Sequence, residues 1–161
     1  YASGEFIICH DSDDWAHPLK IEQQVMPLLL NSSLMATTSD WIKIDNEGSY
    51  FARAAFPYKQ KNPSSLMFRR TTLKTALRNG VLWQPVRTGA DSELYERFKL
   101  LFGNQGLHHI SKPLTLGAHR SDSLMNSEST GIHNIESRIQ RLAYWEKWRL
   151  EHIDMLRHTH Y

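Results

Sequence analysis

The sequence changes abruptly from apolar to acidic in the stretch Phe6-Ile7-Ile8-Cys9-His10-Asp11-Ser12-Asp13-Asp14. The apolar run contains β-branched residues and predicts a short buried strand. The carboxylates that follow it repel one another, and a divalent cation that prefers oxygen ligands, such as Mg²⁺ or Mn²⁺, would relieve that repulsion. Ligand sites of open α/β sheets lie beyond the carboxyl ends of strands, where this acidic turn falls. We therefore expect either a metal site here or a solvated turn before the next helix.

A second polar feature lies further along the chain, at Thr88-Gly89-Ala90-Asp91-Ser92-Glu93. Asp91 begins a predicted helix over 91–102 that Gly103 ends. The positive end of the helix dipole stabilises an ionised carboxylate at this place. Such a carboxylate can act as a general base, and the alternative is an ordinary helix cap.

The remaining pattern alternates strand-like and helix-like segments and predicts an α/β fold with a mixed sheet flanked by helices. After Pro18 a helix is expected to bury Ile21, Val25, Leu28 and Leu29, and Pro27 is expected to kink it or end it early. A loop is expected over 58–64. Further strands are expected at 34–44, 50–56, 65–68 and 107–116, and further helices at 71–79 and 135–156.

Composition excludes several classes of protein. The chain has 161 residues and a formal net charge of +2, without a block of Lys or Arg, which argues against nucleic acid as a partner. Its apolar runs are too short to span a membrane, so we expect no transmembrane segment and a cytoplasmic location, with peripheral attachment to a membrane as an alternative. The single cysteine, Cys9, cannot form an internal disulfide. Since the chain opens without an initiator Met, we expect it to be a fragment of a longer protein.

Several motifs occur in a specific order and spacing over residues 2 to 125. They are Ala2-x-Gly4-Glu5-Phe6-Ile7, His10-Asp11-Ser12-Asp13-Asp14-Trp15, His17-Pro18-x-Lys20, Asn62-Pro63-Ser64-Ser65-Leu66-Met67-Phe68-Arg69-Arg70, Gly89-Ala90-Asp91-Ser92-Glu93-Leu94, Arg97 and Ser123-Leu124. Together they resemble family 2 glycosyltransferases of the GT-A fold. The segment around the acidic turn resembles the family's Asp-x-Asp region, the segment 62–70 its central strand, and the segment 89–97 the stretch with its catalytic base.

The resemblance implies a metal-dependent, inverting glycosyltransferase that moves a sugar from a nucleotide-sugar donor to a hydroxyl of a sugar acceptor. Asp13 would bind Mn²⁺ or Mg²⁺ against the diphosphate, and Asp11 would lie near the ribose or the metal. Asp91 would deprotonate the acceptor, with Glu93 as the second candidate on the acceptor side. These roles are expectations drawn from the family.

Two further positions are expected near the donor and one near the acceptor. Relatives often place a metal- or diphosphate-binding His three residues before the Ser of Ser123-Leu124, and Arg120 stands there in this chain, beside His119. Arg120 would clamp the diphosphate and His119 would ligate the metal, with a plain surface loop as the alternative. Trp83 is expected either to stack on the acceptor or to belong to the core.

The resemblance also implies how the chain is organised. Residues 1–125 would be a partial GT-A catalytic domain without the N-terminal half that binds the nucleotide, so we expect weak activity or none from this chain alone. Residues 126–161 would form a linker and a C-terminal helix that packs on the sheet or meets a partner. Two other functions stay open: a non-catalytic binding module that keeps the fold, and a Mg²⁺-dependent phosphohydrolase. The phosphohydrolase would need further carboxylates, and Asp40, Asp45 and Asp122 lack convincing context.

Overall fold

The computed structural model confirms an α/β fold with a mixed sheet and flanking helices. It describes residues 2–45, 47–51, 58–78, 80–119, 131 and 134–158. The strands run in the order β1-β5-β3-β6-β2, and β4 pairs with β3. Pairing is antiparallel except between β3 and β6. The strands are β1 (Phe6–Ile8), β2 (Trp15–Ala16), β3 (Ala36–Ile44), β4 (Tyr50–Phe51), β5 (Lys59–Arg69) and β6 (Leu107–Ala118), and the α-helices are α1 (Lys20–Leu30), α2 (Leu73–Ala76), α3 (Ala90–Phe102) and α4 (Ile135–His158).

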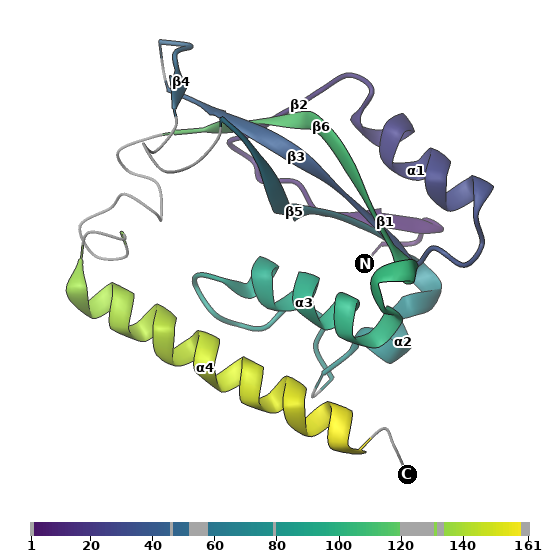
Figure 1. Ribbon diagram of the computed structural model, residues 1–161. Coiled ribbons are helices and arrows are strands. Elements are labelled where there is room, and N and C mark those ends of the chain that lie inside the picture. Colours follow the sequence, from purple (N-terminus) through teal and green to yellow (C-terminus); the bar gives the residue numbers. More distant parts are fainter. Residues whose placement is uncertain are drawn as a thin grey trace.

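The helices form layers on both faces of the sheet (Figure 1). Helix α1 covers one face, α2 and α3 cover the other, and α4 lies outside α3. The core lies between α3 and β5, where Phe68 and Phe98 are fully buried with ring centroids 5.1 Å apart. Leu94 lies on the same face of α3, one turn before Phe98, as the helical spacing predicts.

The buried side of α1 agrees with the predicted one only in part, since Leu28 is fully buried and Val25 half-buried as expected. Ile21 and Leu29 remain 57% and 58% exposed, whereas Gln24 is fully buried with Leu28. Gln24 can be buried because its side-chain amide donates to the carbonyl of Ser65, 2.7 Å away. The expectation that Pro27 ends the helix early is also wrong, since the helix continues to Leu30.

Strand β5 begins earlier than expected, because residues predicted as a loop belong to it. The pairing register with β3 shifts between Thr37 and Ser39, opposite residues 62–67 of β5. This irregularity accommodates Pro63, which cannot donate a ladder hydrogen bond. The hydroxyl of Ser65 takes over one ladder position by accepting a 2.8 Å hydrogen bond from the backbone N–H of Ser39. The bulge thus keeps a proline inside an internal strand.

The segment predicted as a helix over 71–79 is shorter and less regular than expected. A 3₁₀ turn at Arg70–Thr72 leads into α2, which ends at Ala76. Gly80, with a positive φ of 77°, lies after the helix in a tight turn in which Arg78 and Val81 pair.

Helix α4 packs against α3 with its more polar side. Several large apolar residues of α4 are instead exposed; for example, Ile135 and Leu142 are 73% and 61% exposed. The inward side carries Trp148 and His152, which are 4% and 7% exposed. The number of apolar residues on each side of α4 therefore does not decide which side packs against α3.

A buried carboxylate explains the orientation of α4. Glu93 on α3 is fully buried, and its two oxygens lie 2.9 Å from His152 Nε2 and 2.9 Å from Arg97 Nη2. Arg78, 3.5 Å from the same carboxylate, also pairs with Glu151 of α4. Arg97 donates in addition to the carbonyls of residues 76 and 82. This cluster, which we call the Glu93 network, joins α3, α4 and the segment between α2 and α3.

We expect Glu93→Gln to lower the free energy of unfolding by about 3–5 kcal/mol, because it leaves the fully buried Arg97 without its counter-charge. Glu96→Gln is the matched control on the same helix. Glu96 forms a partly exposed ion pair with Lys99, so its loss should cost less than about 1 kcal/mol. Urea denaturation followed by circular dichroism measures both changes, and equal losses would contradict a dominant role for the Glu93 network.

The network also predicts a pH dependence of stability. Burial raises the pKa of Glu93, but the hydrogen bond from His152 and the charge of Arg97 outweigh burial and leave the pKa below its ordinary value of 4.5. A lowered folded-state pKa means that ionised Glu93 stabilises the fold fully above pH 4.5, and that this contribution disappears as the pH falls through the folded-state pKa. The urea concentration at the midpoint of unfolding should therefore fall more steeply with decreasing pH, from pH 7 downward, for the natural chain than for Glu93→Gln.

Candidate active site at the acidic turn and the start of helix α3

The acidic turn lies directly after β1 and is tied to the end of β6. Asp14 Oδ1 accepts a 3.1 Å hydrogen bond from the backbone N–H of Ala118. The backbone carbonyl of Asp14 lies 3.1 Å from Nε2 of His10, and its N–H donates to the carbonyl of Asp11 at 3.2 Å. These bonds fix the turn, while the side chains of Asp11 and Asp13 remain exposed. Two carboxylates are thus presented on a rigid loop at the sheet edge.

The charges around Asp11 place Asp91 nearby. Partial burial raises the pKa of Asp11, and the negative charges of Asp13 and Asp91 raise it further, against the opposing effects of His10 and Lys20. Asp91 is remote in sequence, but strand pairing brings the two regions together. Ile8, at the end of β1, pairs with Met67 of β5, and Ser64, three residues before Met67, donates to Asp91. The acidic turn and the start of α3 therefore border one site.

Lys20 supplies a buried positive charge beneath the turn. It is 2% exposed, its Nζ donates to Thr115 Oγ1 at 2.9 Å, and it lies 3.0 Å from His10 Nδ1. Burial lowers the pKa of Lys20, and the charges of Asp14 and Asp11 oppose this shift. Lys20 offsets part of the acidic charge of the turn without occupying its exposed side.

Asp91 lies in the first turn of α3, half-buried. Gly89 forms the N-cap with a φ of 85°, in the left-handed region that favours glycine. Asp91 Oδ2 accepts a 3.2 Å hydrogen bond from the hydroxyl of Ser64. Ser64 reaches Asp91 because it lies within the β5 bulge. A strand irregularity and a helix start thus jointly orient this carboxylate.

Helix α4 closes over the same place. A Cβ added to Gly89 would lie 3.4 Å from Trp145 Nε1 and 3.5 Å from Tyr144 Cε1, so the two helices are in close contact here. Burial lowers the pKa of Arg141 while the charge of Asp91 raises it, which places this guanidinium near Asp91. Arg141 was not among the site residues expected from the sequence, because only the fold brings it onto the side of α4 that faces α3, and no local pattern marks it.

The other predicted site residues lie in different surroundings. Glu93 is buried in the Glu93 network, so both its oxygens are already paired and it has no access to an acceptor. Trp83 packs partly buried against the core cluster of α3 and β5. His119 follows Ala118, the residue bonded to Asp14, and its N–H donates to the carbonyl of Ile44 at 2.7 Å. Arg120 lies outside the described residues.

The carboxylates of the acidic turn fit a hard divalent cation that takes its remaining ligands from a phosphate and from water. Among the described residues, no three His, Cys, Asp or Glu side chains converge as a closed metal site. Asp11 and Asp13 provide two exposed carboxylates whose repulsion contributes to the raised pKa of Asp11. Mg²⁺ typically takes one or two carboxylates and completes its shell with water and substrate phosphates. An open two-carboxylate site of this kind suits that mode of binding.

We expect Asp91→Asn to lower the pKa of Asp11 toward its ordinary value of 3.8, because the substitution removes one of the charges that raise it. Titration of the Asp11 carboxyl carbon by NMR measures the shift. Glu96→Gln removes a carboxylate from the same helix that does not act on Asp11, and it should leave the titration unchanged. An Asp11 pKa that is insensitive to Asp91→Asn would contradict their proximity.

Comparison with known proteins assigns the chain to no family. The chain matches no protein-family model and no curated protein. Of the helices that the structure describes, none is both long and apolar enough to cross a membrane.

Proposed function

We propose that this chain carries the catalytic side of an inverting, family 2-like glycosyltransferase of GT-A type, which transfers a sugar from a nucleotide-sugar to an acceptor hydroxyl. The observation that carries the proposal is geometric: the acidic turn follows Ile8, which pairs with Met67 of β5, and Ser64 of the same strand donates a 3.2 Å hydrogen bond to Asp91. The charge of Asp91 accordingly raises the pKa of Asp11. A donor site and a general base must border the same reacting carbon, and this proximity meets that requirement.

On the donor side, Asp11 and Asp13 would hold Mn²⁺ or Mg²⁺. When bound, the cation neutralises the charge that builds up on a departing diphosphate. The turn is fixed by the hydrogen bond from Ala118 to Asp14, which leaves Asp11 and Asp13 exposed for this task. His119 would be a further metal ligand, since it is adjacent to Ala118 in sequence, and Arg120 would clamp the diphosphate.

On the acceptor side, Asp91 is the general base. Its carboxylate takes the proton of the acceptor hydroxyl as the oxygen attacks the anomeric carbon, and the bond from that carbon to the diphosphate breaks on the opposite face. One glycosidic bond forms with inversion, and the proton remains on Asp91. The hydroxyl of Ser64, 3.2 Å from Oδ2, orients the carboxylate. Arg141 lies on the side of α4 that packs over the start of α3.

The fold supports this proposal at a coarser level. The segment that resembles the family's central strand forms β5, an internal strand next to β1. Strand β1 is an edge strand whose other side pairs with no described strand, so the sheet can accept a further strand there. The phosphohydrolase alternative gains no comparable support, because Asp40 is 4% exposed and pairs with His109 at 3.0 Å.

Calorimetric titration with Mn²⁺ and a panel of nucleoside diphosphates tests the donor side. We expect Mn²⁺-dependent binding that weakens at least about tenfold in Asp13→Ala, because one of the two carboxylate ligands is lost. Asp154→Ala, which removes an exposed carboxylate of α4, is the matched control and should bind normally. Asp91→Asn should keep nucleotide binding and slow any transfer that the chain supports by about 10²–10⁴-fold. Nucleotide binding that ignores both Mn²⁺ and Asp13 would refute the proposal.

A further inference from the structure

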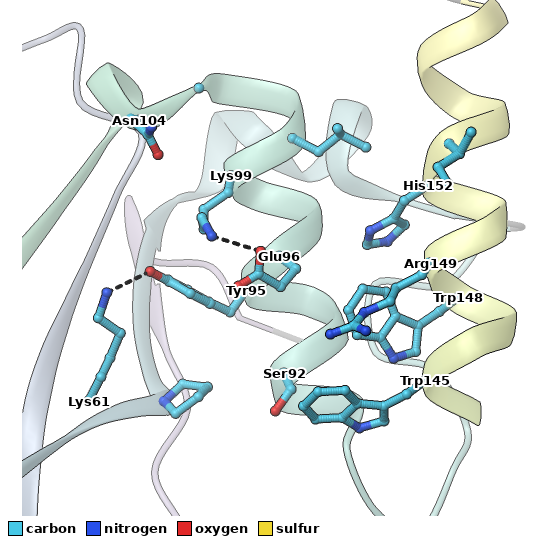
Figure 2. Close-up of a pocket in the computed structure, with 14 residues that line it drawn as sticks. Lys61, Ser92, Tyr95, Glu96, Lys99, Asn104, Trp145, Trp148, Arg149 and His152 are labelled. Carbon is cyan, nitrogen blue, oxygen red and sulfur yellow. Dashed lines mark hydrogen bonds and ion pairs between the residues drawn. The ribbon is translucent and has the colours of Figure 1, made fainter. Parts of the chain in front are cut away.

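A groove of about 840 Å³ lies between α3 and α4 and is bounded on one side by β5 (Figure 2). It begins beside the candidate base, since Ser92 and Pro63 line it and are the chain neighbours of Asp91 and Ser64. From there it follows α3 as far as Asn104. The groove is therefore a surface that leads away from Asp91.

The α3 side of the groove combines an aromatic ring with two cations. Lys61 donates from Nζ to the hydroxyl of Tyr95 at 3.0 Å. Nζ of Lys61 and Nζ of Lys99 lie 5.4 Å and 5.5 Å from the centre of the Tyr95 ring. Figure 2 shows the two lysines reaching the groove from β5 and α3.

The α4 side repeats this chemistry with tryptophan and arginine. The guanidinium carbon of Arg149 lies 5.1 Å from the ring centre of Trp145 and 5.5 Å from that of Trp148. Trp145 is 38% exposed and offers ring surface to a ligand. Trp148 is 4% exposed, and its indole N–H has no hydrogen-bond partner in the described part of the chain. The Trp148 ring therefore forms part of the groove wall, and Trp145 supplies the accessible ring.

The charges that line the groove favour a negatively charged ligand. Lys61, Lys99 and Arg149 line it, and the lining carboxylate Glu96 already accepts from Lys99 at 2.8 Å. The net positive lining favours an anion, which the planar guanidinium can bind through two parallel hydrogen bonds. The rings favour a ligand that also has apolar faces. An acidic saccharide, with C–H faces and carboxylate or phosphate groups, meets both requirements.

We propose that the α3–α4 groove binds an acidic saccharide. This assignment rests on the proposed function, in which the saccharide is the acceptor chain. Its terminal hydroxyl then reaches Asp91, and its anionic groups lie over Lys99 and Arg149. Trp145, and not the core-packed Trp83, is then the aromatic residue of the acceptor side.

Calorimetry tests the proposal with EDTA present and without nucleotide, so that only the groove is measured. The probes are a hexasaccharide of uronic acids, a phosphorylated hexasaccharide, a neutral hexasaccharide and a poly-glutamate peptide. We expect at least one acidic saccharide to bind about tenfold or more tightly than the neutral one, and to weaken in 0.5 M salt. Arg149→Met and Lys99→Met should each reduce its affinity about tenfold. Lys147→Met, on the same helix but outside the groove, is the control and should bind normally.

Equal binding of neutral and acidic saccharides, or no saccharide binding, would overturn the proposal, and so would equal affinity for poly-glutamate. Circular dichroism confirms that each variant is folded. Asp13→Ala separates this proposal from the proposed function, since it should retain saccharide binding while it loses nucleotide binding. Acidic-saccharide binding by a chain whose diphosphate binding is independent of both Mn²⁺ and Asp13 would refute the transferase and leave the groove assignment standing.

Discussion

The Glu93 carboxylate determines how the helical side of the molecule is assembled. A fully buried negative charge is tolerated only when it is paired, and its partners come from α3 itself, from α4 and from the segment between α2 and α3. This requirement turns Trp148 and His152 inward and leaves an apolar side of α4 in solvent. The groove between the two helices, and the approach of Arg141 to Asp91, both depend on that orientation.

Helix α3 therefore has two roles, which two different residues of the helix perform. Its first turn presents Asp91 toward the acidic turn, and the next residue on its buried side, Glu93, holds α4 in place. Because one helix performs both tasks, the distance from the candidate base to the groove is fixed by rigid secondary structure. A ligand that lies along the groove would meet Asp91 in one register.

Local sequence patterns were sufficient for the class of fold and for several elements. Short-range propensity and patterning predict three features correctly: the strand Phe6–Ile8 before the acidic turn, the helix that Gly103 caps, and the mixed sheet. The patterns failed where tertiary pairing decides the outcome. Gln24 is buried because Ser65 provides a hydrogen bond across the fold, and Pro63 lies within a strand because a bulge accommodates it. For the same reason the sequence suggested Asp11 and Asp91 separately but gave no sign of Arg141 or of the groove.

The bulge in β5 has a mechanical consequence for the sheet. It divides the strand into a segment paired with the distal half of β3 and a segment held between β1 and the beginning of β3. Ladder hydrogen bonds do not run continuously between the two segments, so each can open without the other. The first part of β5 can thus fray from β3, and its amides can exchange with solvent, while residues 67–69 remain paired with β1.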